Sequence, residues 1–112
     1  MIINFNSISE AFLEKFKGGD GGMFSRQFTD CDNKIMLNRL PVGASVGYHK
    51  HECNSEIIYI FSGEAKCIFD DNEEYFSAGE CHYCPKGHSH SLINNSKSEE
   101  LCFFAVVAEH SK

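Results

Sequence analysis

Two histidines stand two residues apart in a segment that is expected to form a β-strand. Side chains in a strand alternate between its two faces, so His49 and His51 leave the same face and can reach one metal ion. Glu56 follows five residues later and begins the apolar run Glu56–Phe61, after the short loop Glu52–Ser55. If this loop closes a hairpin, the carboxylate returns beside the two imidazoles.

The surroundings of Glu56 make a purely structural role costly. Ile58 and Ile60 share its face of the strand, and a carboxylate buried on an apolar face is unfavourable unless a cation or hydrogen bonds compensate it. Further along the chain, His88 and His90 repeat the same-face spacing on another expected strand. His90 therefore offers a third imidazole from a different part of the sequence.

Each of these residues also has a structural alternative. Taken alone, a histidine or glutamate at a strand end is more often a surface residue or a hydrogen-bonded core residue than a metal ligand. The combination favours metal chemistry. Three imidazoles and one carboxylate, with no thiolate required, suit iron, manganese, cobalt, nickel, copper or zinc, whereas calcium and magnesium prefer oxygen ligands.

Short β-strands are predicted along most of the chain, because short apolar or alternating segments are bounded by turn residues. The predicted strands are Phe24–Thr29, Lys34–Leu40, Ser45–His51, Glu56–Phe61, Ala65–Asp70, Glu74–Ser77, Cys81–Cys84, His88–Asn94 and Leu101–Ala108. Short strands at this spacing are typical of an all-β sandwich or barrel.

One helix is predicted near the N-terminus. Ser7 and Glu10 have the spacing of a capping box, which marks the start of a helix. The apolar residues that recur on one helical face are Ile8, Ala11, Phe12 and Phe16. The helix is expected to stop at Gly18-Gly19, and the glycine-rich run 18–22 is expected to form a flexible loop within one domain.

Composition excludes several classes of function. The 112 residues contain 42% hydrophobic and 23% charged residues, the balance of one globular domain. The formal net charge of −6 argues against nucleic-acid binding, which needs a basic face. The longest apolar runs fall far short of the roughly 20 residues that a membrane-spanning helix requires.

The six cysteines are expected to be mostly free thiols. A disulfide framework needs a secreted context, and the first residues, Met1–Phe5, lack the basic segment of a signal peptide. We therefore expect a cytoplasmic protein. Cys81 and Cys84 form a Cys-x-x-Cys motif, but residues three apart on a strand point to opposite faces, which makes them poor partners for one metal ion.

Two glycine-bounded segments together resemble both motifs of the cupin superfamily. In the first, five residues separate Gly43 from His49, one separates His49 from His51, four separate His51 from Glu56, and six separate Glu56 from Gly63. The fixed residues of the second are Gly79, Pro85, Gly87, His90 and Asn94. Every fixed position of both motifs is occupied at an allowed spacing.

The resemblance implies a small cupin β-barrel, that is, a double-stranded β-helix of the jelly-roll type, with one barrel only. Residues 1–112 would form a single cupin domain, with an N-terminal segment over 1–22 and the barrel over 23–112. It further implies one divalent transition-metal ion inside the barrel, with His49, His51, Glu56 and His90 as the ligands.

The reaction and the substrate stay open, because cupins include enzymes and binding proteins alike. One hypothesis is a metal-dependent enzyme, a dioxygenase or an isomerase or epimerase, acting on a small organic molecule chelated to the ion. The other is a non-catalytic module that binds or senses metal or a small ligand. Catalysis needs an acid or base beyond the ligands, for which His88 and Tyr48 are the candidates, followed by His82 and Tyr83. Arg39 is either an inward group for a substrate carboxylate or a solvated strand end.

The last predicted strand, Leu101–Ala108, is apolar on both faces. A strand of this kind needs cover beyond the barrel interior, from the N-terminal segment or from a second subunit. Resemblance to small cupins also points to a homodimer, which we therefore expect.

Overall fold

The computed structural model describes residues 1–110, and their regular secondary structure is almost entirely β. Two short 3-10 turns, η1 (Phe5–Ser7) and η2 (Phe16–Gly18), lie near the N-terminus. The strands are β1 (Ala11–Glu14), β2 (Gly22–Thr29), β3 (Asn33–Leu40), β4 (Ser45–Lys50), β5 (Asn54–Ser62), β6 (Glu64–Phe69), β7 (Asn72–Ser77), β8 (Cys81–Cys84), β9 (Ser89–Asn94) and β10 (Leu101–Glu109). Among the described residues, no helix is long and apolar enough to cross a membrane.

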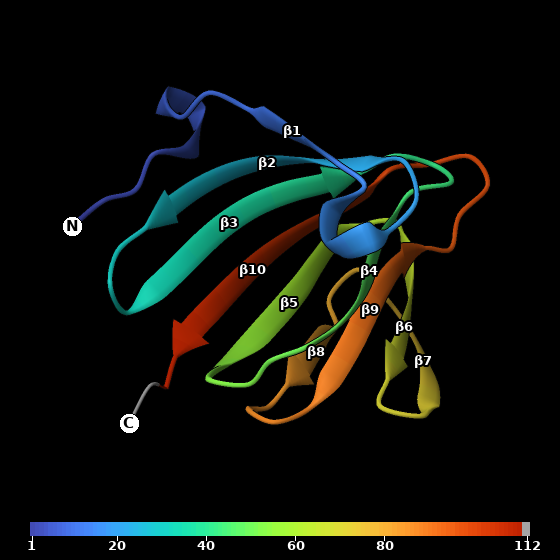
Figure 1. Ribbon diagram of the computed structural model, residues 1–112. Helices are drawn as coiled ribbons and strands as arrows, with labels where there is room; N and C mark the ends of the chain where they lie inside the picture. Colours follow the sequence, from blue (N-terminus) through green and yellow to red (C-terminus); the bar gives the residue numbers. More distant parts are fainter. Residues whose placement is uncertain (111–112) are drawn as a thin grey trace.

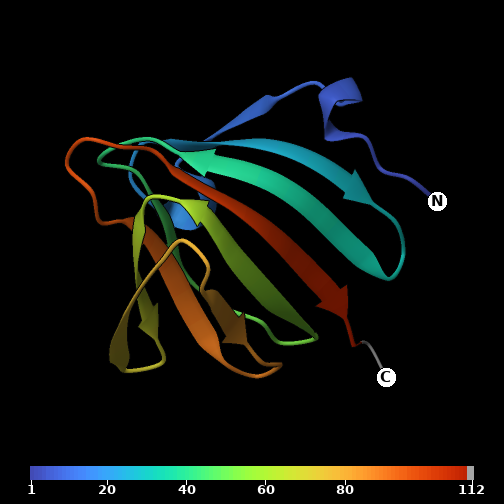
Figure 2. The same cartoon turned by 180° about the vertical axis from the view of Figure 1, so that it is seen from behind.

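The strands form two antiparallel sheets that lie against each other (Figure 1). The larger sheet has the order β1-β2-β3-β10-β5-β8, and the smaller has the order β4-β9-β6-β7. In both views β2 and β3 lie on one side of the molecule and β6 and β7 on the opposite side (Figure 2). β10 pairs with both β3 and β5 and so occupies the middle of the larger sheet.

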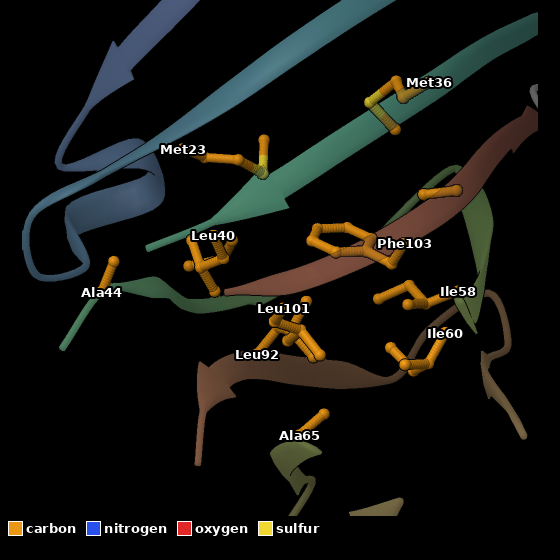
Figure 3. Close-up of a cluster of buried hydrophobic side chains, with 12 residues drawn as sticks. Met23, Met36, Leu40, Ala44, Ile58, Ile60, Ala65, Leu92, Leu101 and Phe103 are labelled. Carbon is orange, nitrogen blue, oxygen red and sulfur yellow. The ribbon is translucent and has the colours of Figure 1, made fainter. Parts of the chain in front are cut away.

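The hydrophobic core lies between the two sheets (Figure 3). Leu40, Leu101 and Ile60 are completely buried, and Phe103 is 2% exposed. Alternation explains the arrangement, because every second residue of β3, β5 and β10 points into the space between the sheets. The barrel expected from the sequence is therefore confirmed, with its interior filled by apolar side chains at one end.

All nine predicted strands are present, with boundaries within two residues of those expected. The predicted N-terminal helix is not formed, because this segment makes β1 between the two 3-10 turns. In β1, Leu13 pairs with Met23 of β2 and packs on the core, while Phe12 points outward onto Phe24. Pairing to the sheet edge and burial of Leu13 outweigh the helical spacing of the apolar residues.

The turn η2 lies directly against β4 through two glycines. A Cβ on Gly19 would stand 2.0 Å from the Ser45 carbonyl oxygen, and one on Gly47 would stand 1.9 Å from the Lys17 carbonyl oxygen. Only glycine permits so close an approach of two backbones. This contact places Phe16 and Lys17 at the wall of the cavity described below.

Candidate metal centre

Four side chains from three strands and a connecting segment converge inside the barrel. They are His49 of β4, His51 just after β4, Glu56 of β5 and His90 of β9, and their ligand atoms all lie within 4.8 Å of one another. The Nε2 atoms of His51 and His90 are 2.9 Å apart, and Glu56 Oε1 lies 3.2 Å from the first and 3.0 Å from the second. The structure thus brings together all four residues of the predicted metal site.

The pairing of β4 with β9 places His49 directly opposite His90. The pairing is irregular between Val46 and His49, and this changes the alternation of side chains along β4. As a result Val46 and His49 both point inward, although they are three residues apart, and Tyr48 points outward. His51 is held after the end of β4 by a backbone hydrogen bond from its N–H to the His88 carbonyl. The inward direction of the two imidazoles follows from these contacts.

Glu56 reaches the histidines by a route that differs from the hairpin considered above. β4 belongs to the smaller sheet and β5 to the larger one, so the segment between them crosses from one sheet to the other. The carboxylate therefore faces the histidines across the barrel interior. Ile58 and Ile60 follow it on the inner face of β5, as the alternation predicts.

The Nδ1 atom of each histidine is engaged in a hydrogen bond away from the cluster. Nδ1 of His49 donates to the Gly47 carbonyl oxygen at 2.7 Å, and Nδ1 of His51 lies 2.5 Å from Asn54 Oδ1. Nδ1 of His90 lies 3.0 Å from Nε2 of His82. Hydrogen bonds of this kind fix a ring and leave its other nitrogen for a metal, so the orientation of the three rings fits an ion in their midst.

The charges in the cluster are arranged around the Glu56 carboxylate, whose side chain is 12% exposed. Burial by itself raises the pKa of Glu56, but hydrogen bonds from His51 and His90 outweigh it and hold the pKa at about 2. Burial lowers the pKa of His49. For His51 burial also opposes the charged form, yet hydrogen bonds with Glu56 and Asn54 raise its pKa overall. An ionised carboxylate beside three imidazoles is a donor set for a divalent transition metal.

A cavity of about 290 Å³ adjoins the cluster. Its deeper wall is apolar, and its outer part carries charged and polar side chains. The residues that line it besides the four ligands are Phe16, Lys17, Met23, Lys34, Met36, Asn38, Val46, Lys50, Glu52, Cys53, Asn54, Ile58, Leu92, Phe103 and Val107. Three of the lining residues are lysines and two, Glu52 and the ligand Glu56, are glutamates, so the cavity has a small excess of positive charge in a chain of net charge −6.

Asn38 contributes a polar group to the buried part of this wall. Asn38 is only 4% exposed. Within residues 1–110, its Oδ1 is the buried side-chain oxygen that has no hydrogen-bond partner. Asn38 is not among the site residues predicted from the sequence. A signal was present, because Asn38 shares its strand face with Met36 and Leu40, and a polar residue on an apolar face requires an explanation.

The two predicted catalytic residues lie elsewhere. His88 precedes β9, which begins at Ser89, and its Nδ1 lies 2.6 Å from Asp70 Oδ2. The Tyr48 hydroxyl donates to the Asp70 carbonyl oxygen at 3.0 Å, and this side chain is exposed. Neither residue is among the described residues that line the cavity. The expectation that His88 shares the inward face of His90 is wrong, because the strand alternation begins only after His88.

Other residues singled out from the sequence take structural positions. Arg39 points outward, where its guanidinium lies 2.8 Å from Glu10 and 2.7 Å from Glu100 and covers the Phe24 ring at 3.8 Å. It is therefore not among the residues that line the cavity beside the metal cluster. Cys53 does line the cavity and is exposed.

The cysteines divide into exposed and buried thiols. All six are free, and Cys81 is exposed whereas Cys84 is buried, as the alternation predicts. Burial raises the pKa of both Cys67 and Cys84 to about 12. The thiolate is the reactive form of cysteine. These two side chains are therefore protected from thiol reagents, because they are buried and because they stay protonated.

We expect a thiol-specific disulfide reagent at pH 8 to modify Cys31, Cys53 and Cys81 quickly in the native protein. Cys67 and Cys84 should react only when denaturant unfolds the chain. Peptide mass mapping after timed labelling distinguishes the two classes. Rapid native labelling of Cys67 would contradict the burial described above.

The fold and the cluster together define a class of protein: a small antiparallel barrel of two sheets whose interior carries three histidines and a glutamate. A family model described as Cupin domain matches residues 36–107, and this chain belongs to the cupin family. The match covers β4 to β9 with the segments before and between them, which hold both motifs and all four candidate ligands.

Comparison with known proteins supports this assignment. The chain is 34% identical over 115 residues to an oxalate-binding protein of Thermotoga maritima, covering 96% of this chain and 93% of the relative. A solved structure of a predicted oxalate decarboxylase, also from Thermotoga maritima, superposes with a TM-score of 0.89 at 28% identity, covering 97% of this chain and 99% of the other. A sugar phosphate isomerase of the cupin superfamily from Silicibacter pomeroyi has a TM-score of 0.77 at 19% identity, covering 97% and 76%, and this likeness concerns the fold alone.

Proposed function

We propose that this protein binds one divalent transition-metal ion through His49, His51, Glu56 and His90, and that the ion holds a small carboxylate such as oxalate. The observation that carries the proposal is the convergence of four ligand atoms within 4.8 Å. When bound, the ion supplies a positive centre with open positions that carboxylate oxygens can occupy. Iron, manganese, nickel, cobalt, copper and zinc all suit this donor set.

The charges around the cavity support an anionic ligand. Lys17, Lys34 and Lys50 line it. Glu56 is assigned to the metal ion, so these three ammonium groups face one other carboxylate, that of Glu52, and the excess of positive charge attracts anionic ligands. The apolar deep wall leaves few polar partners for a long polar ligand. The amide of Asn38 is the buried exception, and its unpaired oxygen provides an acceptor for a hydroxyl or a protonated carboxyl group.

The names of two similar proteins support oxalate as the ligand. A relative at 34% identity is called an oxalate-binding protein, and a structure at 28% identity is called a predicted oxalate decarboxylase. Oxalate has two adjacent carboxylates, which makes it a bidentate ligand for a metal ion. We therefore propose a dicarboxylate of this size in preference to a sugar or an aromatic molecule.

Binding without turnover is the reading that we favour over a dioxygenase or an isomerase. A catalyst needs a proton donor or acceptor near the ligand, and the two candidates for this role, His88 and Tyr48, both bond to Asp70. A catalytic role for either residue stays a prediction. Loss of turnover in His88→Gln, with ligand binding retained, would support it.

Calorimetric titration with oxalate tests the proposal. Oxalate is expected to bind protein loaded with manganese or zinc, and to give no heat of binding with metal-free protein. Lys34→Ala should weaken the affinity by up to roughly fivefold, because an ion pair between solvent-accessible groups contributes up to about 1 kcal/mol. Lys97→Ala, on an exposed loop, serves as the matched control. Equal binding with and without metal would contradict the proposal.

We further propose a homodimer that covers the outer face of the larger sheet. Ile57, Tyr59 and Phe61 of β5 and Tyr83 of β8 are each at least 40% exposed on this face. Exposed apolar side chains gathered on one face are typical of an interface. Sedimentation equilibrium at micromolar concentration is expected to give twice the mass of the chain, and Phe61→Lys should shift the equilibrium toward the monomer. A monomeric wild type would refute this part.

A cytoplasmic location belongs to the same proposal. All six cysteines are free, which is the usual state in a reducing compartment. We regard residues 1–112 as a single cupin domain, with 1–22 as its N-terminal segment and 23–112 as the barrel.

A further inference from the structure

A row of hydrogen bonds leads from the surface of the smaller sheet to the candidate metal centre. The Glu74 carboxylate of β7 lies 3.0 Å from Nδ1 of His82, and Nε2 of His82 lies 3.0 Å from Nδ1 of His90. The His82 side chain is 2% exposed and that of His90 is 2% exposed, whereas Glu74 is 45% exposed. The centroids of the His82 and His90 rings are 5.2 Å apart, and their planes make an angle of 21°. The row therefore connects a carboxylate at the edge strand with a ligand histidine.

The chemistry of the three groups gives this row a direction. An ionised carboxylate only accepts hydrogen bonds, so the nitrogen of His82 that faces Glu74 carries a proton. The other nitrogen of a neutral imidazole is an acceptor. With Nε2 of His90, the atom that faces the metal cluster, bound to an ion, its Nδ1 keeps the proton and donates to this acceptor on His82.

Cys67 does not interrupt this row. Its Sγ lies 3.4 Å from Nε2 of His82, and Cys67, His82 and His90 together have the composition of a second metal site. The thiol, however, donates its proton to the Ser91 carbonyl oxygen at 2.7 Å. Both nitrogens of His82 are also engaged. Cys67, His82 and His90 therefore form a hydrogen-bond network around His90 and not a second metal site.

We propose that Glu74 and His82 are positioning residues that keep a proton on Nδ1 of His90 and so direct its Nε2 to the metal ion. This inference rests on the proposed metal site, to which it adds two residues outside the four ligands. Hydrogen bonds to the second nitrogen of a ligand histidine fix its tautomer and ring orientation, and their loss commonly weakens metal affinity by about 10- to 100-fold.

The direction of the row can be measured in zinc-loaded protein. Two-dimensional NMR of its histidine ring nitrogens is expected to show a proton on Nδ1 of His82 and none on its Nε2. Glu74→Leu should convert His82 to a mixture of tautomers. Glu73→Leu is the matched control, because Glu73 is the neighbour of Glu74 on β7 and contacts Lys66 instead. A proton on Nε2 of His82 in the wild type would overturn the proposal.

Metal affinity provides the second readout. His82→Leu should weaken zinc binding by about 10- to 100-fold, and His82→Gln should recover most of this loss, because its amide oxygen can accept from His90. If the His82→Leu chain does not fold, the comparison of Glu74→Leu with Glu73→Leu decides. Unchanged zinc affinity in folded His82→Leu would overturn the proposal. A wild type that binds no zinc would refute the metal site itself, whereas a wild type that binds zinc together with unchanged affinity in His82→Leu would overturn only the positioning role.

Discussion

The His49→Ala/His90→Ala double variant is expected to lose more than about 100-fold in affinity for a divalent transition metal, well beyond what loss of an outer hydrogen bond costs. Two of the four ligands are removed, and they come from paired positions on β4 and β9. His51 and Glu56 then remain as a bidentate site that binds metal weakly. Competition against a chromophoric zinc chelator measures the change directly.

His88→Ala is the matched control for this variant. His88 is also a histidine near β9, but its ring bonds to Asp70 and stacks on Phe69 at 5.4 Å. Its removal should leave zinc affinity unchanged. Circular dichroism must show that the double variant is folded, because it also takes one hydrogen-bond partner from the buried Glu56 carboxylate. Wild-type zinc affinity in a folded double variant would exclude these ligands.

Phe103→Ala is expected to lower the free energy of unfolding by about 3–5 kcal/mol. Phe103 is among the largest fully buried side chains and lies between the two sheets in the middle of the core (Figure 3). Its strand, β10, is paired on both sides, so the backbone has little freedom to close the void that the substitution leaves. Urea denaturation followed by far-ultraviolet circular dichroism measures the loss.

Phe104→Ala provides the comparison on the same strand. Phe104 points to the outer face of the sheet, where its ring meets that of Phe5 at 6.3 Å. We expect a smaller loss of stability than for Phe103→Ala at protein concentrations where the chain is monomeric. Equal losses for the two substitutions would mean that the core does not lie on the Phe103 face of β10.

Much of the barrel could be predicted because its strands obey a simple alternation between turns. Glu56, Ile58 and Ile60 show this most clearly, since all three share the inner face that their spacing predicts. The alternation failed at two points. Nothing in the sequence marks the irregularity before His49 or the start of β9 at Ser89, and the second of these decides that His88 points away from the cavity.

Contacts between segments far apart in the chain could not be predicted in the same way. The N-terminal segment has the apolar spacing of a helix, yet Leu13 packs against the core and β1 pairs with β2. The row from Glu74 to His90 joins β7, β8 and β9, and only the packing of both sheets brings these residues together. His82 could be suspected from its inward position, but its partners could not.

The metal content of the purified protein shows whether His49, His51, Glu56 and His90 hold an ion, and it is measured on untagged protein because a histidine tag would itself bind metal. Elemental analysis of freshly purified wild-type protein, or of metal-free protein reconstituted at neutral pH and then dialysed, is expected to give close to one transition-metal ion per chain. Wild-type protein that carries no metal and takes up none on reconstitution would contradict the claim and leave a metal-free binding barrel.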